Sequence, residues 1–304
     1  MVNPLRFGCL CLTACVALTA ARGQTQGAPA AVPGTRSISQ ISAGWRFQMD
    51  VSDLGEKEQW YGTGFDRSAW AKVSVPKAWD LYDEALWGYE GLGWYAARID
   101  GRLARKGQAQ RLKFGRVNYH SKVWLNGELL GENVIGYLPF EFDVTGKLNS
   151  DRENILVLRV DNKARLSWLP GAKQIEWIQY GGILEPVALE TSATVYISDL
   201  TINAVPEGAG ASIHCAAEIT SQEATAKEIV LRLGVAGHPQ SVKSVTLKVA
   251  PGSKSAENVV VSLKTANPWS PEKPFQTCRR TSSPYRDRPE YPLCSRNNRR
   301  NSPC

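Results

Sequence analysis

The chain has 304 residues, of which 43% are hydrophobic and 21% charged, a composition typical of a globular protein of one or two domains. Its net charge of +7 belongs to the two ends, because residues 1–23 contribute +2 and residues 276–304 contribute +5, which leaves about zero for residues 24–275. The folded body therefore has no electrostatic attraction for a polyanion, and we expect no nucleic-acid partner.

Cysteine usage excludes two further classes of protein. Three of the seven cysteines lie within the first 15 residues and three lie beyond residue 277, so Cys215 is alone in the body of the chain. A single thiol cannot form an internal disulfide, and no paired C-x-x-C spacing is present for zinc. We interpret Cys215 as a small buried residue of a strand, and we expect no metal site and no cofactor.

The first 23 residues have the anatomy of a secretory signal peptide. Arg6 precedes an apolar run from Phe7 to Ala20, and small residues flank Arg22. The run is too short to span a bilayer, so we expect an exported protein, periplasmic or secreted, with no stable membrane insertion. Residues 12–15 (LTAC) resemble a lipoprotein box, but the residues after the cysteine stay apolar, which favours cleavage over lipidation.

A spacer and a series of short strands follow. Residues 24–36 are rich in Pro, Gly and Ala and predict a flexible linker. Alternating apolar residues predict strands within residues 38–47, 94–99 and 111–162. Within the last stretch, Asn126-Gly127 separates two apolar runs and predicts a two-residue hairpin turn, which fixes the register of a meander.

These strands predict an all-β fold. No helical-period run interrupts residues 37–193, so we expect one jelly-roll β-sandwich there. Short alternating strands predict a second, immunoglobulin-like sandwich over residues 194–275, without its last strand. Residues 276–304 show no apolar alternation and predict a disordered or aberrant tail. The tail is either a basic nucleic-acid arm or, the favoured alternative, the end of a truncated or frame-shifted coding sequence.

Tryptophan is concentrated in the first predicted sandwich. Nine of the ten tryptophans lie between Trp45 and Trp177. Exposed rings stack on the C–H faces of sugars, whereas most rings in a sandwich belong to the core. The stretch from Trp79 to Trp94 is therefore a candidate carbohydrate-binding surface, with Trp87 as the residue to test.

Other catalytic patterns are weak. Glu141 and Asp143 match the first two positions of the E-x-D-x-x-E pattern of jelly-roll glycanases, but Gly146 occupies the last. Outward-facing acids on a half-buried strand are the favoured interpretation. No G-x-S-x-G motif is present, and the three histidines have no motif partners.

A set of motifs occurs in a characteristic order: Trp45-Arg46-Phe47, Val75-Pro76 with Trp79, Gly93-Trp94-Tyr95, Phe114-Gly115-Arg116-Val117, Val123-Trp124-Leu125-Asn126-Gly127, Pro139-Phe140-Glu141-Phe142-Asp143-Val144-Thr145 and Gly181-Gly182-Ile183. Together they resemble the N-terminal sugar-binding jelly roll of glycoside hydrolase family 2, the family of β-galactosidases, β-glucuronidases and β-mannosidases. Residues 267–275 resemble the motif that closes the family's second, immunoglobulin-like domain. The resemblance covers about residues 38–275.

The resemblance implies a galactose-binding-like jelly roll and a partial immunoglobulin-like domain of an exported, often homo-oligomeric glycosidase. Catalysis in the family takes place in a later (β/α)8 barrel of about 250 residues, and 29 residues follow Phe275. Retaining glycoside hydrolysis needs two carboxyl groups on that barrel, so no catalytic residue is assigned. The chain is interpreted as the non-catalytic N-terminal portion of such an enzyme; the alternative is a stand-alone carbohydrate-binding protein.

The resemblance also implies a contribution to a sugar site. In the family, a carboxylate just before the glycine pair hydrogen-bonds a hydroxyl of the terminal sugar, and Glu176 lies at that place, where Asp is usual. A carboxylate can accept two sugar hydroxyl groups. Glu176, Trp177 and Tyr180 are therefore the predicted substrate-binding residues for a terminal β-linked sugar; the alternative makes Glu176 a solvated loop acid. Glu185 stands where the family often has Arg.

Overall fold

A computed structural model describes residues 36–168, 179–235 and 238–267 of the chain. These residues form antiparallel strands joined by turns and by three short 3-10 helices, η1 (Trp79–Leu81), η2 (Glu84–Leu86) and η3 (Gly101–Leu103). None of the described helices is long and apolar enough to cross a membrane.

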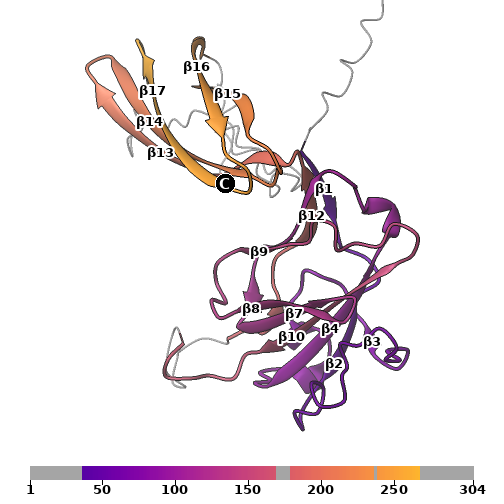
Figure 1. Cartoon of the computed structure of the whole chain (residues 1–304). Coiled ribbons are helices and arrows are strands. Elements are labelled where there is room, and N and C mark those ends of the chain that lie inside the picture. The colour runs from indigo at the N-terminus through magenta and orange to yellow at the C-terminus, as the bar shows by residue number, and fades with distance from the viewer. Residues whose placement is uncertain (1–35, 169–178, 236–237, 268–304) are drawn as a thin grey trace, which may run out of the picture. The chain divides into compact units, whose positions relative to one another are not determined.

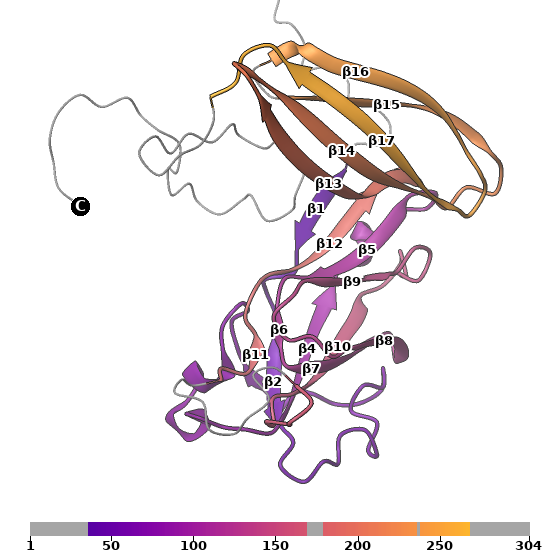
Figure 2. The same ribbon diagram turned by 90° about the vertical axis from the view of Figure 1, so that its left-hand side faces the viewer.

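The strands up to residue 192 form a sandwich of two antiparallel sheets (Figures 1 and 2). The four-stranded sheet contains, in spatial order, β1 (Ser37–Gln40), β12 (Val187–Ser192), β5 (Ala109–Phe114) and β9 (Phe140–Asp143). The six-stranded sheet contains β3 (Ala71–Lys72), β2 (Arg46–Met49), β4 (Leu92–Ile99), β10 (Asn154–Asp161), β7 (His120–Leu125) and β8 (Glu128–Asn133). Two short strands, β6 (Val117–Asn118) and β11 (Gly182–Ile183), pair only with each other among the described residues.

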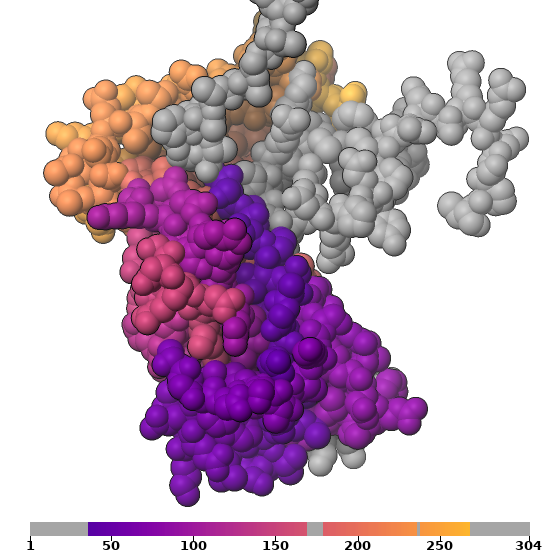
Figure 3. Space-filling view, turned by 90° about the vertical axis from the view of Figure 1, so that its right-hand side faces the viewer, coloured from indigo at the N-terminus to yellow at the C-terminus, as the bar shows by residue number. Residues whose placement is uncertain are grey.

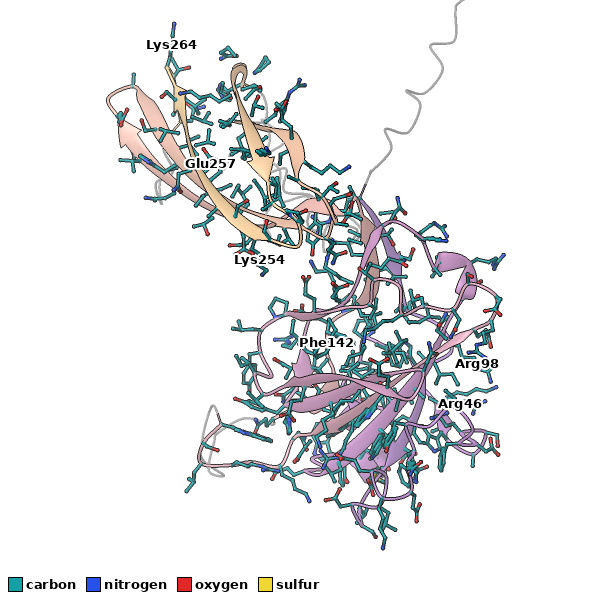
Figure 4. All side chains as sticks on the ribbon, viewed as in Figure 1. Arg46, Arg98, Phe142, Lys254, Glu257 and Lys264 are labelled. Carbon is teal, nitrogen blue, oxygen red and sulfur yellow. The ribbon has the colours of Figure 1, made fainter. Side chains whose placement is uncertain are left out.

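Alternation along the strands fills the space between the sheets. In β10, Leu156 and Leu158 point inward, and they share one core with Leu112 and Phe114 of β5 in the opposite sheet. Because successive side chains of a strand point to opposite faces, every second residue of these strands is available to that core. Figure 4 shows Phe142 among the crowded side chains of this sandwich, and Figure 3 shows the indigo-to-magenta residues as a closely packed surface on the face turned to the viewer.

The outer face of the six-stranded sheet carries a second cluster of aromatic side chains. Trp94 of β4 stacks against Trp124 of β7 with ring centroids 5.3 Å apart, and Trp60 and Trp70 from the preceding turn-rich segment complete the cluster. Arg46, which projects from β2 in Figure 4, donates hydrogen bonds to the backbone oxygens of Ser68 and Trp70. The turn-rich segment therefore caps a sheet face that would otherwise expose several indole rings.

The Asn126-Gly127 turn is confirmed. Leu125 of β7 pairs directly with Glu128 of β8, and the two turn residues have φ angles of 54° and 84°. These positive angles are the ones a two-residue hairpin of this kind requires, and Asn and Gly tolerate them best.

The prediction of a single meander over residues 111–162 is wrong. β5 pairs with β9 in one sheet, whereas β7, β8 and β10 belong to the other. The physical reason is that an isolated meander would leave one apolar face uncovered, and dividing the strands between two sheets buries both inner faces against each other.

The strands after residue 194 form two further sheets. One has the order β13 (Val195–Glu207), β14 (Gly210–Ser221) and β17 (Lys254–Leu263), and the other pairs β15 (Lys227–Val235) with β16 (His238–Val249). β13 is one long strand, and its pairing with β14 has an irregularity between Ile197 and Asp199. The all-β character predicted for this part of the chain is confirmed.

Candidate functional site

The three predicted substrate-binding residues lie in two different situations. Glu176 and Trp177 are outside the described residues. Tyr180 is described, and 40% of its surface is exposed immediately before the glycine pair. The structure therefore describes the C-terminal part of the predicted site, which consists of Tyr180 and the glycine pair that follows it.

The glycine pair is held between two segments that are distant in sequence. On one side, the backbone amide of Trp79 donates to the Gly181 oxygen at 3.0 Å, and the Gly181 amide donates to Oδ2 of Asp80 at 3.0 Å. On the other side, Gly182 pairs with Asn118 across β11 and β6. We call this group of five residues, Trp79, Asp80, Asn118, Gly181 and Gly182, the glycine clamp.

Close packing explains why both positions are glycine. A Cβ atom on Gly181 would lie 2.2 Å from ring atoms of Trp79, and one on Gly182 would lie 2.3 Å from the Tyr95 hydroxyl. Gly182 also has a φ of 99°, a region that residues with a side chain rarely adopt. The clamp therefore fixes the backbone closely and admits no side chain at its centre.

Two asparagines hold the backbone just before the clamp. Nδ2 of Asn118 donates to the Tyr180 oxygen at 2.5 Å, and Nδ2 of Asn162 donates to the oxygens of Tyr89 at 3.1 Å and Gln179 at 3.4 Å. Both asparagines are 1% exposed. Tyr180 is thus an exposed ring on an anchored backbone.

Burial shifts the pKa of three titratable groups in and around the clamp. Burial raises the pKa of Asp80, and the backbone amides of Gly181, Asp80 and Gly88 offset part of that rise. Burial also raises the pKa of Tyr82 to about 12 and that of Tyr95 well above its ordinary value. Both phenols therefore stay protonated at neutral pH, and the clamp presents rigid polar backbone rather than a reactive acid or base.

The acids considered from the sequence have structural partners. Glu141 forms an ion pair with Lys113 at 3.0 Å, and Asp143 accepts a hydrogen bond from the Thr145 amide at 2.8 Å. Glu185 lies 3.7 Å from the guanidinium of Arg116. The favoured interpretation of Glu141 and Asp143 as outward-facing acids agrees with their exposed positions on β9.

The tryptophan stretch provides one exposed ring. Trp79 and Trp94 are fully buried, whereas Trp87 is 61% exposed. Trp79 belongs to the clamp, and Trp94 donates from Nε1 to Asp50 at 2.9 Å beneath the aromatic cap. Of these three rings, Trp87 alone can stack on a ligand.

Thiol and metal chemistry find no support in the described part of the chain. Cys215 is buried, and burial raises the pKa of its thiol, which disfavours a thiolate nucleophile. No group of three or more potential metal ligands occurs among the described residues.

Comparison with known proteins connects this geometry to a family. Residues 38–192 match the family model described as the sugar-binding domain of glycosyl hydrolases family 2, and that stretch is half of the chain. The chain belongs to glycoside hydrolase family 2. The family predicted from the motifs is confirmed, and the glycine clamp lies within the matched residues.

Relatives of this family 2 chain include named glycosidases. It is 28% identical to a β-glucuronidase of Paenibacillus borealis, over 60% of this chain and 34% of the relative. It is 26% identical to a β-galactosidase of Thermoanaerobacter pseudethanolicus, over 79% of this chain and 32% of the relative. The family 2 chain thus spans about a third of the length of these two relatives.

Solved structures support the fold. A putative β-galactosidase from Bacteroides fragilis superposes with a TM-score of 0.67 at 22% identity, over 79% of this chain and 37% of that one. A Bacteroides uniformis β-glucuronidase gives a TM-score of 0.66 at 19% identity, over 79% and 29% of the two chains. The β-sandwich architecture predicted for the family 2 chain is confirmed.

Two residues of the clamp were not predicted from the sequence. Asn118 had one weak signal, since it is a polar residue between Val117 and Tyr119. Asp80 had none, because an acid beside a tryptophan in a turn-rich stretch is ordinary. Its partner, Gly181, lies 101 residues away along the chain.

Proposed function

We propose that this chain is the non-catalytic, sugar-binding portion of an exported family 2 glycosidase. The observation that carries the proposal is the match of residues 38–192 to the family's sugar-binding domain. We propose further that Glu176, Trp177 and Tyr180 contact a terminal β-linked sugar beside the glycine clamp. Tyr180 supports this part, because an exposed aromatic ring on a fixed backbone can stack on a sugar with little loss of entropy.

Bond cleavage is assigned to the part of the relatives that this chain does not match. Retaining hydrolysis needs two carboxyl groups about 5 Å apart, one to protonate the leaving oxygen and one to attack the anomeric carbon. The glycine clamp contains one carboxylate, that of Asp80, which is 3% exposed and bonded to a backbone amide. In the family, both catalytic carboxylates belong to the (β/α)8 barrel.

Calorimetry and a hydrolysis assay test the proposal together. We expect the purified chain to bind methyl β-glucuronide or methyl β-galactoside and to release no p-nitrophenol from the corresponding aryl glycosides. Tyr180→Ala should weaken binding about tenfold, because loss of a stacked ring costs about 1 kcal/mol or more. Turnover that disappears in Glu176→Gln would contradict the assignment of cleavage to another part of the enzyme.

A second candidate function is a stand-alone carbohydrate-binding protein that uses Trp87. Its support is the 61% exposure of that ring. A glycan array separates the two candidates: loss of binding in Trp87→Ala with full binding in Tyr180→Ala favours the Trp87 surface. The reverse pattern favours the clamp.

We also propose roles for the segments on either side of the first sandwich. Residues 1–23 act as a signal peptide and export the protein, and residues 194–275 form an immunoglobulin-like domain. Fusion of residues 1–36 to alkaline phosphatase tests export, since the reporter is active only in an oxidising compartment. An inactive but intact fusion would exclude the export proposal.

A further inference from the structure

We infer that Asp80 is a positioning residue of the sugar site: its buried carboxylate holds the Gly181 backbone and thereby fixes the exposed ring of Tyr180. The inference rests on the proposed function, because it concerns the site that would bind the sugar. It adds a residue from a different segment of the chain, 100 positions before Tyr180.

Consecutive residues of η1 bind both backbone polar groups of one residue, Gly181. Trp79 donates its amide to the Gly181 oxygen, and Asp80 accepts the Gly181 amide, each at 3.0 Å. The Lys77 amide donates to the Ile183 oxygen at 3.0 Å, which extends the same pairing by two residues. One edge of the glycine pair therefore forms hydrogen bonds with η1 and the segment before it, and the other edge pairs with β6.

A buried carboxylate is a costly acceptor for backbone amides. Asp80 is 3% exposed, and no salt bridge to it occurs among the described residues. Burial of an uncompensated charge is unfavourable, so a residue with a purely structural role at this position would do better as a neutral acceptor. A charged acceptor does form shorter and stronger hydrogen bonds with amides, which favours it where the backbone must be held rigidly.

The hydrogen bond between Asp80 and the Gly181 amide acts on the backbone directly beside Tyr180. Asn118 binds the Tyr180 oxygen and Asp80 binds the Gly181 amide, and these two atoms belong to the peptide group that follows Tyr180. Asn162 binds the Gln179 oxygen in the peptide group that precedes Tyr180, so the backbone is held on both sides of that residue. Gly181 cannot shift toward η1, since Trp79 already fills the space where a Cβ would lie. Removing the Asp80 carboxylate is therefore expected to let this backbone move away from η1 and to change the orientation of the exposed ring.

The experiment compares three variants of the full chain. Asp80→Ala removes the acceptor, Asp80→Asn keeps a neutral acceptor, and Asp83→Ala is the matched control. Asp83 also accepts a backbone amide, that of Ala85 at 2.9 Å, but it does so locally at the start of η2. The readouts are affinity for methyl β-glucuronide and methyl β-galactoside by calorimetry, hydrogen exchange of the Gly181 amide by NMR, and Tm.

We expect Asp80→Ala to weaken sugar binding about tenfold, as the loss of one hydrogen bond to a charged group predicts. The Gly181 amide of this variant should also lose its protection from hydrogen exchange. Asp80→Asn should retain affinity within about threefold of wild type, since the acceptor remains. Asp83→Ala should match wild type in both readouts.

Two outcomes overturn the inference. A folded Asp80→Ala chain with wild-type affinity shows that the clamp does not depend on the carboxylate, while the proposed function stands. If the wild-type chain binds neither sugar and the Asp80→Ala variant loses exchange protection at the Gly181 amide, the proposed function is overturned and Asp80 has a structural role only.

Discussion

Gly182 shows how strongly single residues are constrained at the clamp. Its φ of 99° and the Tyr95 hydroxyl, 2.3 Å from an ideal Cβ, act against any side chain. We predict that Gly182→Ala lowers the free energy of unfolding by about 2 kcal/mol, through backbone strain and overpacking combined. Gly64→Ala is the matched control, because no atom lies within 4 Å of its Cβ position. Equal denaturation midpoints for the two variants would contradict the packing described for the clamp.

Glu190 is the centre of a buried charge cluster in the four-stranded sheet. It forms ion pairs with Arg111 and Arg36, and Lys113 lies 3.5 Å away. Burial raises the pKa of Glu190, but the hydrogen bonds from the two arginines and the Lys113 charge outweigh it, so the net pKa is below 4.5. The cluster ties β12 to β5 and to the residue that precedes β1.

This lowered pKa predicts a pH dependence of stability. Because the unfolded carboxyl group binds protons at higher pH than the folded one, Glu190 stabilises the fold above about pH 4.5, and that stabilisation is lost as the pH falls through its folded pKa. We predict that Glu190→Gln costs about 3 kcal/mol at pH 7, since it leaves buried arginine charge uncompensated. Urea denaturation at pH 7 and pH 4 checks this; a cost that does not shrink at the lower pH would be inconsistent with the ion pairs.

At the scale of elements, the β7–β8 hairpin depends on two turn residues with different roles. Gly127 supplies a positive φ, and Asn126 also binds the Ile155 amide and the Asn154 side chain. We predict that Gly127→Ala costs about 1 kcal/mol, from backbone strain alone. Asn126→Ala should cost about 2 kcal/mol, because it also leaves the Ile155 amide without its acceptor. Thermal denaturation ranks the two variants, and the opposite order would refute the role given to Asn126.

This hairpin was predictable from sequence because its determinants are local. Two adjacent residues set the turn, and the alternation of their neighbours sets the faces. The division of β5, β9, β7 and β10 between two sheets was not predictable in the same way, since alternation states that a face is buried but not which face covers it.

The residues of the candidate site were predictable only where they belong to motifs that are contiguous in sequence. Tyr180 and the glycine pair were found through motifs, which are contiguous in sequence. Asp80 and Asn118 act on them from distant positions, and the contact arises only when η1, β6 and β11 come together. The aromatic cluster that includes Trp60 and Trp70 was not predicted for a related reason, because its rings lie on the outer face of a sheet.

Across the whole molecule, the interior cores of the first sandwich and of β13–β17 differ in size, and the first sandwich also carries the aromatic cluster on its outer face. The core of the first sandwich includes Trp45, Trp79, Tyr95 and Phe114, all fully or almost fully buried. The core of β13–β17 has six buried members, none of them aromatic: Ala217, Ile219, Leu231, Val249, Val259 and Val261. Since stabilisation scales with the apolar area removed from water, the second core contributes less.

We predict that the β13–β17 part opens before the first sandwich. Limited proteolysis should cut first within residues 194–267 and leave a resistant fragment close to residues 36–192. Hydrogen exchange should be faster in β15 and β16 than in β4 and β10. Preferential trimming of the first sandwich would contradict this order of stability.

Binding of a sugar beside the glycine clamp can be measured by two-dimensional NMR of the wild-type chain titrated with methyl β-glucuronide and methyl β-galactoside. We expect saturable shifts of the Tyr180, Gly181 and Gly182 amides and of the Asn118 side-chain amide. Shifts confined to the surroundings of Trp87, or no shifts with either sugar, would contradict it.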